Sequence, residues 1–434
     1  MKKTSKLILL LFITIFVLTA CQSKAAETPA APETSGTAVL RLGTRDGSTL
    51  LDLHQSTIAL YEADNPDVLV QLEAVADRDY DTRLQTMFTA GAAPDIMQLA
   101  DESIPEFVAQ GDLVALDDYF PTSFDSAAYL PNLLAPGQVD GDQYLLPKSY
   151  STLAIYYNKT LFDEAGVPYP EDGWTWDDLL DVALDLTQDL DGDNAPDIWG
   201  LQLPATWTTG FEYWVAAAGG QLVSDNGKDF VGYMDSEAVI NAVTFYADLY
   251  NKYRVSPPPT DLEAAYGGNT EFVDGNAAML LFDRSIEAEL LTNRNIELGV
   301  VGLPQGEERA NILFWEGYGV ASTSAYPRTA ANFLTFYTGE QGNEVWLNTS
   351  LPTVLSVAES SGLSTDPIAS VWINELSYVV PRAYTFTPYW DEAGVPALAA
   401  ALQTAILEKN ADISALMTQA ALDAQTALDA LLGN

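Results

Sequence analysis

Cysteine and histidine are almost absent from this sequence of 434 residues, which holds one cysteine, Cys21, and one histidine, His54. A lone cysteine cannot form an internal disulfide, and zinc sites built from several cysteines or histidines are excluded as well. A Ser-His-Asp hydrolase would have to use His54, which has no nucleophile-elbow motif beside it. We therefore expect no catalytic or zinc-binding histidine and interpret His54 as a solvated or capping side chain.

Positive charge is also scarce. The chain has 19 Lys and Arg against 61 Asp and Glu, so its formal net charge is −42. Such an acidic surface repels nucleic acid, which is not expected as a partner. An anionic ligand would need a strong local exception to this field. Long apolar runs are missing apart from one near the start, so we expect no transmembrane helix in the mature chain.

That apolar run, Leu7–Leu18, follows three lysines and has the n-region and h-region of a secretory signal. It leads into Leu-Thr-Ala before Cys21, which resembles the lipobox of bacterial lipoproteins. In those proteins the cysteine is lipidated and the signal is cleaved ahead of it. We interpret residues 1–21 as a lipoprotein signal peptide ending at the lipidation site Cys21. The protein is then expected outside the cytoplasm, in the periplasm or on the outer face of the cytoplasmic membrane, anchored by acyl chains.

Residues 22–37 contain no large apolar side chain and are rich in Ala, Pro, Glu, Ser and Thr. Such a segment cannot bury a core and is interpreted as a flexible tether. The remaining residues, 38–434, are too many for one ordinary core, so two lobes are expected.

Strand and helix patterns alternate at the start of this folded part. Strands are predicted at Val39–Thr44, Val68–Ala74 and Asp95–Leu99, with helices at Thr49–Asp64 and Tyr80–Thr89 between them. This alternation is typical of an α/β fold with a largely parallel sheet. Later helices are predicted at Ile104–Gln110, Thr175–Leu186 (capped by Thr175), Phe211–Ala218, Glu237–Lys252, Val395–Lys409 and Asp412–Leu432.

Several ordered motifs carry a family resemblance. They are FTAGAAPDIM at Phe88–Met97, LPKSYSTLAIYYNKTLF at Leu146–Phe162, WTWDDL at Trp174–Leu179 and FVDGNAAM at Phe272–Met279. Together they span most of the mature chain, which resembles the extracellular solute-binding proteins of bacterial ABC importers. The similarity is greatest to the sugar-binding family that includes maltose-binding protein. Any one of the motifs is weak, but their shared order is specific.

The resemblance implies a two-lobe, type II periplasmic-binding-protein-like fold. Each lobe would be a mixed, mainly parallel sheet flanked by helices, with a ligand cleft between the lobes and a hinge closing around the ligand. The N-terminal lobe would comprise 38–150 plus 304–338, and the C-terminal lobe 151–303 plus 339–434. A monomeric binding protein, and not an enzyme, would deliver its ligand to ABC permease subunits in the membrane.

The implied ligand is a carbohydrate, and the many tryptophans favour one of di- or oligosaccharide size. Two other functions stay open: a secreted carbohydrate-active hydrolase using paired carboxylates, and a sensing or adhesion protein on the same fold. Neutral sugars stack on aromatic rings and bond to fixed polar groups, so aromatic and polar residues near expected strand ends are candidates for ligand contact. The candidate ligand-binding residues are Arg45, Asp46, Asp101, Glu102, Tyr150, Trp207, Trp214, Asp283, Arg284, Trp315, Glu316, Tyr318, Tyr384 and Trp390. The alternative for the aromatic members is ordinary core packing.

The stretch DLDGDNAPDIWG, from Asp189 to Gly200, resembles a calcium-binding loop of the EF-hand type. Asn194 stands where the loop usually has glycine, and Gly200 replaces the final bidentate glutamate, so the site is incomplete. We expect a structural Ca²⁺ here and no catalytic cofactor; the alternative is a solvated turn whose carboxylates bond local amides. The expected ligands are Asp189, Asp191, Asp193 and Asp197 through their carboxylates and Ala195 through its carbonyl.

Overall fold

The computed structural model describes residues 36–75, 80–262, 270–347 and 349–433. The predicted signal peptide, Cys21 and nearly all of the predicted tether lie outside the described residues, so the lipid anchor stays a prediction. The pattern of contacts divides the chain into two units, Met1–Gly36 and Thr37–Asn434. The second of these units contains two sheets and is described below.

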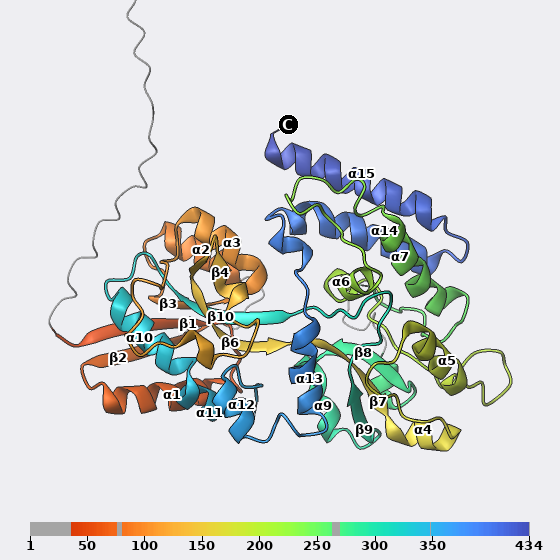
Figure 1. Ribbon diagram of the computed structural model, residues 1–434, viewed down its shortest axis with the longest axis horizontal. Helices are drawn as coiled ribbons and strands as arrows, with labels where there is room; N and C mark the ends of the chain where they lie inside the picture. The colour runs from red at the N-terminus through yellow and green to blue at the C-terminus, as the bar shows by residue number, and fades with distance from the viewer. Residues whose placement is uncertain (1–35, 76–79, 263–269, 348, 434) are drawn as a thin grey trace, which may run out of the picture. The chain divides into compact units, whose positions relative to one another are not determined.

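The first sheet has five strands in the order β2-β1-β3-β10-β6 (Figure 1). Strands β1 (Ala38–Thr44), β2 (Val68–Ala74) and β3 (Ile96–Ala100) are parallel. Strand β10 (Phe314–Val320) is antiparallel to both of its neighbours, β3 and β6 (Leu145–Ser151). As a result, the carboxyl ends of β1, β3 and β6 and the amino end of β10 meet at one edge of the sheet.

Helices cover both faces of this sheet, which explains why every residue of β3 is buried. On one face Ile96 packs with apolar residues of α1 (Leu51–Asp64) and α10 (Pro327–Tyr337). On the other face Met97 and Leu99 pack with residues of α2 and α3. The alternation follows from the two-residue repeat of a strand. Helix α2 spans Tyr80–Thr89 and α3 spans Ile104–Gln110, the ranges predicted for them.

The second sheet has three strands in the order β8-β7-β9. Strand β7 (Leu153–Asn158) is antiparallel to β8 (Met279–Asp283) and to β9 (Leu298–Val301). The prediction of a mainly parallel sheet in each lobe is therefore wrong for these three strands. Strands β8 and β9 are joined through α9 (Glu287–Thr292) and run in the same direction on either side of β7. Strand β7 follows directly after β6 and runs in the opposite direction to both.

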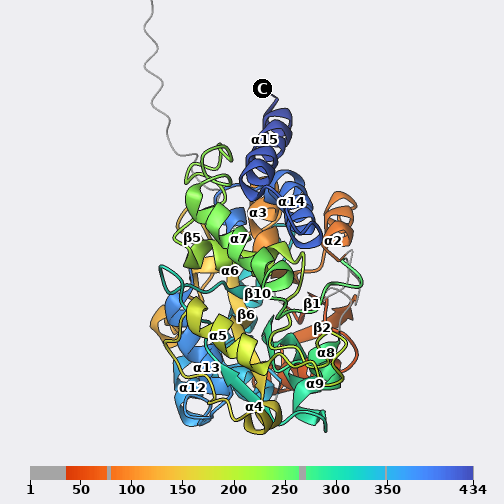
Figure 2. The same ribbon diagram turned by 90° about the vertical axis from the view of Figure 1, so that its right-hand side faces the viewer.

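Helices α5 (Trp176–Leu186), α6 (Thr208–Ala217), α7 (Glu237–Asn251), α14 (Val395–Leu407) and α15 (Ile413–Leu432) enclose one face of β7 in a continuous core. Figure 2 shows α15 and α14 stacked beside α7. Their ranges agree with the predicted ones to within a few residues. The remaining elements are α4 (Lys159–Ala165), α8 (Glu271–Asp274), α11 (Glu340–Trp346), α12 (Leu355–Ser360), α13 (Ala369–Glu375), β4 (Gln138–Val139) and β5 (Asp142–Gln143).

Helix α5 begins as the sequence predicts. The Thr175 side chain accepts a hydrogen bond from the Asp178 backbone N–H, and the Asp178 carboxylate accepts one from the Thr175 backbone N–H at 2.8 Å. This capping box satisfies donors that would otherwise lack partners at the first turn. Trp174 is 7% exposed and Trp176 packs on Trp214, so the two tryptophans hold the start of this helix against the core.

The Asn311 side chain ties three chain segments together beside the β6–β7 connection. Its Oδ1 accepts from the Leu153 N–H at 3.0 Å, and its Nδ2 donates to the Leu153 carbonyl at 2.9 Å and to Glu375 Oε2 at 2.7 Å. The Asn311 backbone also bonds to Tyr378 and Val380. Asn311 is 0% exposed, so this junction is fully internal.

Helix α11 packs against α1 and α10, and its Trp346 belongs to the core beside the first sheet. The predicted division had placed this helix in the C-terminal lobe. The packing groups α11 with the first sheet, while the lobe boundaries as a whole stay a prediction.

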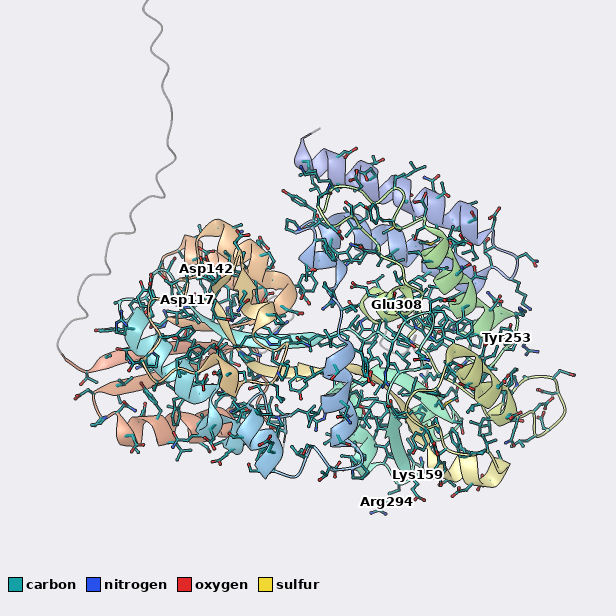
Figure 3. All side chains as sticks on the ribbon, viewed as in Figure 1. Asp117, Asp142, Lys159, Tyr253, Arg294 and Glu308 are labelled. Carbon is teal, nitrogen blue, oxygen red and sulfur yellow. The ribbon has the colours of Figure 1, made fainter. Side chains whose placement is uncertain are left out.

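The described residues include no helix that is both long enough and apolar enough to cross a membrane. The exterior carries much of the acidic charge. Asp117, Asp142 and Glu308 lie on the outside of the chain, with Arg294 among the few cations there (Figure 3).

Candidate functional site

A cavity of about 610 Å³ lies where the strand ends of the first sheet meet β8 and α9. Residues from β1, β3, β6 and β10 reach the cavity because the ends of these strands converge at one edge of the first sheet. The second sheet contributes the turn after β8. The cavity brings together eight of the predicted ligand-binding residues: Arg45, Asp101, Glu102, Tyr150, Asp283, Arg284, Trp315 and Glu316. Whether they contact a ligand stays a prediction.

Strand pairing explains part of this arrangement. Trp315 pairs with Tyr150 across the β10–β6 ladder, and Glu316 pairs with both Ser149 and Ala100. Trp315 is only 2% exposed, and its Nε1–H donates to the Leu133 carbonyl at 2.9 Å. Trp315 therefore supports the cavity wall from the core and offers little ring surface to a ligand.

Apart from Tyr150, the other predicted aromatic residues do not line this cavity. Trp214, Tyr318 and Trp390 are at most 2% exposed and belong to the hydrophobic cores. Their positions agree with the core-packing alternative. Trp207 packs on Phe282 and Phe314, with ring centroids 4.9 and 5.3 Å apart. Of this aromatic cluster, Phe314 is the member that lines the cavity.

Arg382 joins the carboxylates behind one wall of the cavity. Its guanidinium is 6% exposed and lies 3.4 Å from Glu102, 3.7 Å from Asp101 and 3.5 Å from Glu212. The hydroxyl of Tyr384, another predicted site residue, donates to Asp101 Oδ2 at 2.5 Å. Burial raises the pKa of Asp101 to about 7, although the guanidinium opposes that shift. Asp101 is thus a carboxyl group that changes charge near neutral pH.

Glu316 is supported by a chain of polar contacts that continues into the first core. Its Oε2 accepts from Gln98 Nε2 at 2.9 Å and lies 3.6 Å from Lys148 Nζ. The same ammonium lies 2.7 Å from the carboxylate of Asp46. Asp46 was predicted to bind ligand, but it is 8% exposed and does not line the cavity.

His54 is 0% exposed, so its interpretation as a solvated or capping residue is wrong. Its Nε2 lies 2.8 Å from Asp46 Oδ2, and its Nδ1 lies 2.6 Å from the Tyr337 hydroxyl. Burial lowers the pKa of His54. Burial alone would raise the pKa of Asp46, but hydrogen bonds from His54 and Lys148 hold it well below its usual range. A neutral imidazole therefore donates from Nε2 to Asp46 and accepts at Nδ1 from Tyr337.

Sequence reasoning missed several lining residues and their supports. Ser149 and Ser151 flank Tyr150 in a quoted motif, and Phe314 precedes Trp315, so their neighbours could have indicated them. Glu287 lies three residues after Arg284, a spacing that favours an ion pair on a helical turn. No local sequence pattern indicates the remaining residues, because only the tertiary fold brings them to the cavity. They are Arg382, Glu212, Thr349 and Ser350.

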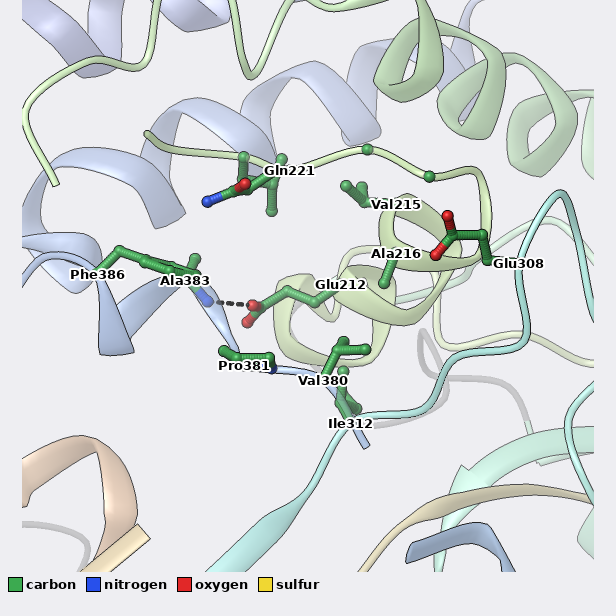
Figure 4. A pocket seen from close by; sticks show the side chains of 13 residues that line it. Glu212, Val215, Ala216, Gln221, Glu308, Ile312, Val380, Pro381, Ala383 and Phe386 are labelled. Atoms are coloured by element: carbon green, nitrogen blue, oxygen red, sulfur yellow. Dashed lines mark hydrogen bonds between the residues drawn. The ribbon is translucent and has the colours of Figure 1, made fainter. Parts of the chain in front are cut away.

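A smaller cavity of about 210 Å³ lies between α6, the following glycine-rich turn and the segment around Pro381 (Figure 4). Its lining is mostly apolar, and Glu212 faces the segment from α6. The Glu212 carboxylate accepts from the Ala383 N–H at 2.7 Å, the dashed bond of the figure. None of the predicted site residues lines it. The Glu212–Ala383 bond fixes the segment that carries Arg382 to α6.

The aspartate-rich loop has carboxylates that converge. Oxygens of Asp189, Asp191 and Asp197 lie within 4.8 Å of one another, and all three residues are exposed. Asn194 has φ +66°, the left-handed conformation expected at the sixth position. Asp193 does not belong to this converging group; its carboxylate accepts from the Ala195 N–H at 2.7 Å.

The loop carboxylates also bond to backbone amides, as the turn alternative expected. Asp189 accepts from Gly192 and Asn194 at 2.7 and 2.9 Å, and Asp197 accepts from Leu190 at 2.6 Å. A carboxylate has about four acceptor positions, so these bonds leave others for a cation. The oxygen donors therefore fit a hard cation such as Ca²⁺, and the twelfth-position ligand is still absent at Gly200.

Comparison with known proteins gives concordant results. The sequence profile of the bacterial extracellular solute-binding protein family matches residues 44–344. A binding protein of Brucella abortus (strain 2308) is 27% identical over 252 residues, which span 57% of this chain and 58% of that relative's length.

Solved structures match the fold over nearly the whole chain. An ABC substrate-binding protein of Listeria monocytogenes in complex with cycloalternan has a TM-score of 0.76 at 23% identity, covering 92% of this chain and 99% of the other. UgpB of Mycobacterium tuberculosis in complex with glycerophosphocholine has a TM-score of 0.75 at 22% identity, covering 92% and 100%. These matches confirm the predicted type II binding-protein fold.

Proposed function

Because the chain belongs to the family of bacterial extracellular solute-binding proteins, we propose that it captures a carbohydrate for an ABC importer. The cavity of about 610 Å³ at the meeting edge of the two sheets carries this proposal. Its volume falls within the range of about 300–1,000 Å³ typical of small-molecule sites. The ligand is of di- or oligosaccharide size, as cycloalternan is the ligand named for the Listeria protein.

The chemistry of the wall supports a polyhydroxylated ligand. Carboxylates, guanidinium groups, serine hydroxyls and the Tyr150 hydroxyl offer donors and acceptors in several directions. Phe314 gives the apolar surface on which the C–H face of a sugar ring stacks. Closure of the two sheets around such a ligand would exclude water and present a new surface to the permease.

A thermal-shift screen with a carbohydrate panel tests this function on the chain from residue 22 onward. A bound ligand raises the melting temperature by mass action, and calorimetry then gives the affinity. We expect a saturable shift with one class of saccharide, weakened at least about tenfold by Glu316→Gln because a charged hydrogen bond to a hydroxyl is lost. Glu308→Gln, exposed and outside the cavity of about 610 Å³, is the matched control. No shift with any saccharide would refute the proposal.

A hydrolase remains the alternative with one observation in its favour, the pKa of about 7 at Asp101. A general acid needs such a value, but it also needs a proton free to leave. The Asp101 carboxylate is occupied by Tyr384 and Arg382, which favours a structural role. Prolonged incubation with the bound saccharide separates the two: we expect the ligand to be recovered intact by mass spectrometry.

The membrane anchor is a separate part of the proposal. We propose that Cys21 carries acyl chains and keeps the protein next to its permease. Expression with labelled palmitate is expected to mark the wild-type chain and leave Cys21→Ser unlabelled. Label retained in that variant would refute the assignment.

We further propose that the loop from Asp189 to Asp197 binds a structural Ca²⁺. The three converging carboxylates and the left-handed Asn194 support it. Calorimetric titration is expected to give one Ca²⁺ per chain with a Kd in the range of about 10⁻⁵–10⁻³ M, because the bidentate twelfth ligand is missing. Asp191→Ala should lose this heat, while Asp225→Ala, in another exposed turn, should keep it. Equal heats from both variants would show that the loop is an ordinary turn.

A further inference from the structure

Every guanidinium group that lines the cavity of about 610 Å³ is already paired with a carboxylate of that lining. Arg45 lies 4.0 Å from Glu316, and Arg284 lies 2.7 Å from Glu287. A cation that is neutralised in this way attracts an incoming anion weakly. Within the described residues, the lining therefore offers no free positive charge to a phosphate or a carboxylate of a ligand.

The cationic side chains just behind the lining are also paired with carboxylates. Lys148 pairs with Asp46 at 2.7 Å, and Arg382 pairs with Glu212 at 3.5 Å, in addition to their contacts with lining carboxylates. The cavity and its supports thus hold seven carboxyl groups against four cationic groups. The seven are Asp46, Asp101, Glu102, Glu212, Asp283, Glu287 and Glu316.

Asp283 is the lining carboxylate without a cationic partner in the described part of the chain. Its Oδ1 accepts from the Ser285 N–H at 2.8 Å and from the Ser285 hydroxyl at 2.5 Å. The neighbouring Arg284 extends its Nη2 to Glu287 and not to Asp283. Burial raises the pKa of Asp283, which means that its negative charge is poorly compensated by the protein.

Two unpartnered polar groups point to a ligand beside Asp283. The Tyr150 hydroxyl is buried and has no hydrogen-bond partner among the described residues, in a side chain only 6% exposed. Arg284 Nε likewise has no partner there. Both atoms are sealed in this structure, and because unpaired buried polar groups cost free energy, each is expected to gain a partner when the site closes around a bound molecule. Together they require a ligand with a donor for Asp283 and Tyr150 and an acceptor for Arg284.

We propose that the cleft selects an amino sugar, a saccharide in which a protonated amine replaces a hydroxyl. The ammonium donates to the free oxygen of Asp283 and to the Tyr150 hydroxyl, and a neighbouring sugar hydroxyl accepts from Arg284 Nε. A neutral sugar satisfies the same hydrogen bonds but leaves the charge of Asp283 uncompensated. A phosphorylated or acidic sugar adds charge of the wrong sign. This inference rests on the proposed carbohydrate-binding function and specifies its ligand.

The test compares matched ligands by calorimetry on the chain from residue 22 onward, near pH 6.5. The probes are the β-1,4-linked glucosamine dimer, cellobiose as its neutral counterpart and the N,N′-diacetylated dimer, whose amines are blocked. Glucosamine and glucose form a second matched pair without a glycosidic bond. We expect each amine to bind at least about tenfold more tightly than its neutral counterpart, because hydrogen bonds between ionised groups are about twice as strong as neutral ones. The acetylated dimer should lose this advantage.

Two carboxylate variants locate the effect. Asp283→Asn keeps an acceptor for the Ser285 amide and removes the charge, so the amine and its neutral counterpart should bind within about twofold of each other. Glu289→Gln makes the same change on an exposed residue of α9 that does not line the cavity, and it should preserve the wild-type preference. Melting temperatures of both variants confirm that they are folded.

The outcomes separate the ligand from the function. Equal or weaker binding of the amine in the wild type overturns the amino-sugar assignment, as does a preference that survives in Asp283→Asn. If neutral saccharides bind and the amines do not, the proposed function stands and this inference fails. If no saccharide of either kind binds, both fail together.

Discussion

Lys148 offers the sharpest test of how the cavity is supported. Its side chain is 6% exposed, and it supplies the ammonium that lies 2.7 Å from Asp46, a carboxylate 8% exposed. Lys148→Met keeps the length and apolar volume of the stem but removes the charge. Asp46 then keeps only His54 as a partner capable of carrying positive charge. Removing one member of a buried ion pair typically costs about 3–5 kcal/mol, because the other charge is left unpaired.

The loss should depend on pH. In the wild type, burial is the main cause that lowers the pKa of His54, and Lys148 adds to it by charge repulsion. Without that ammonium the His54 pKa rises, so a proton bound in acid can take over the role of the lost charge. We therefore expect a loss of about 3–5 kcal/mol near pH 8 and a smaller loss near pH 5.5.

Urea denaturation of both proteins at the two pH values measures these differences. Lys252→Met is the control, since Lys252 forms an exposed ion pair with Asp248 at 3.2 Å, and such pairs contribute little to stability. A loss below about 1 kcal/mol for Lys148→Met near pH 8 would show that the buried pair does not stabilise the fold. A loss that is equal at both pH values would refute the coupling to His54.

Four further outcomes are expected. Trp315→Ala should lower the free energy of unfolding by about 3–5 kcal/mol in urea denaturation, because the ring is buried; a loss near zero would mean that the ring is dispensable to the core. Gly227→Ala should destabilise far more than Gly219→Ala, since both have left-handed φ but only at Gly227 would a Cβ lie 2.0 Å from a backbone oxygen; equal melting temperatures would contradict this. Nitrogen NMR of the single histidine should show a neutral His54 protonated at Nε2 near pH 7, and a pKa at or above the usual value of about 6.5 would contradict the lowering of its pKa by burial. The folded pKa of Asp101 is about 7, above its unfolded value, so ionising Asp101 costs the wild type stability as the pH rises from 5.5 to 8. The melting temperature of Asp101→Asn minus that of the wild type should therefore be larger at pH 8 than at pH 5.5.

The bounds of individual helices and strands could be predicted from the sequence, because neighbouring residues determine them. Helix α5 starts at the Thr175–Asp178 capping box, and α1 ends where Asn65 precedes a proline. Strand β2 was predicted at its observed bounds from simple alternation. Periodicity does not report strand direction, so the antiparallel pairing of β7 with both neighbours could not be read from it.

The candidate site was accessible only in part. Residues just after strands, such as Arg45 and Asp101, line the cavity because parallel strand ends meet at one edge, while their contact with a ligand stays a prediction. Aromatic type alone did not separate a lining ring from a core ring, as Trp214 and Trp390 illustrate. Burial of His54 could not be inferred, because its partner Tyr337 is 283 residues away in sequence.

The Asn311 junction has a mechanical consequence. One side chain holds Leu153, the segment that precedes β10 and the Glu375 segment at a common point, so those segments cannot slide past one another without breaking several buried bonds. Any motion between the sheets would then be bending at residues beside this junction, such as Thr152 and Leu313. Because displacement grows with distance from a pivot, small torsions there would move the far ends of the two sheets most.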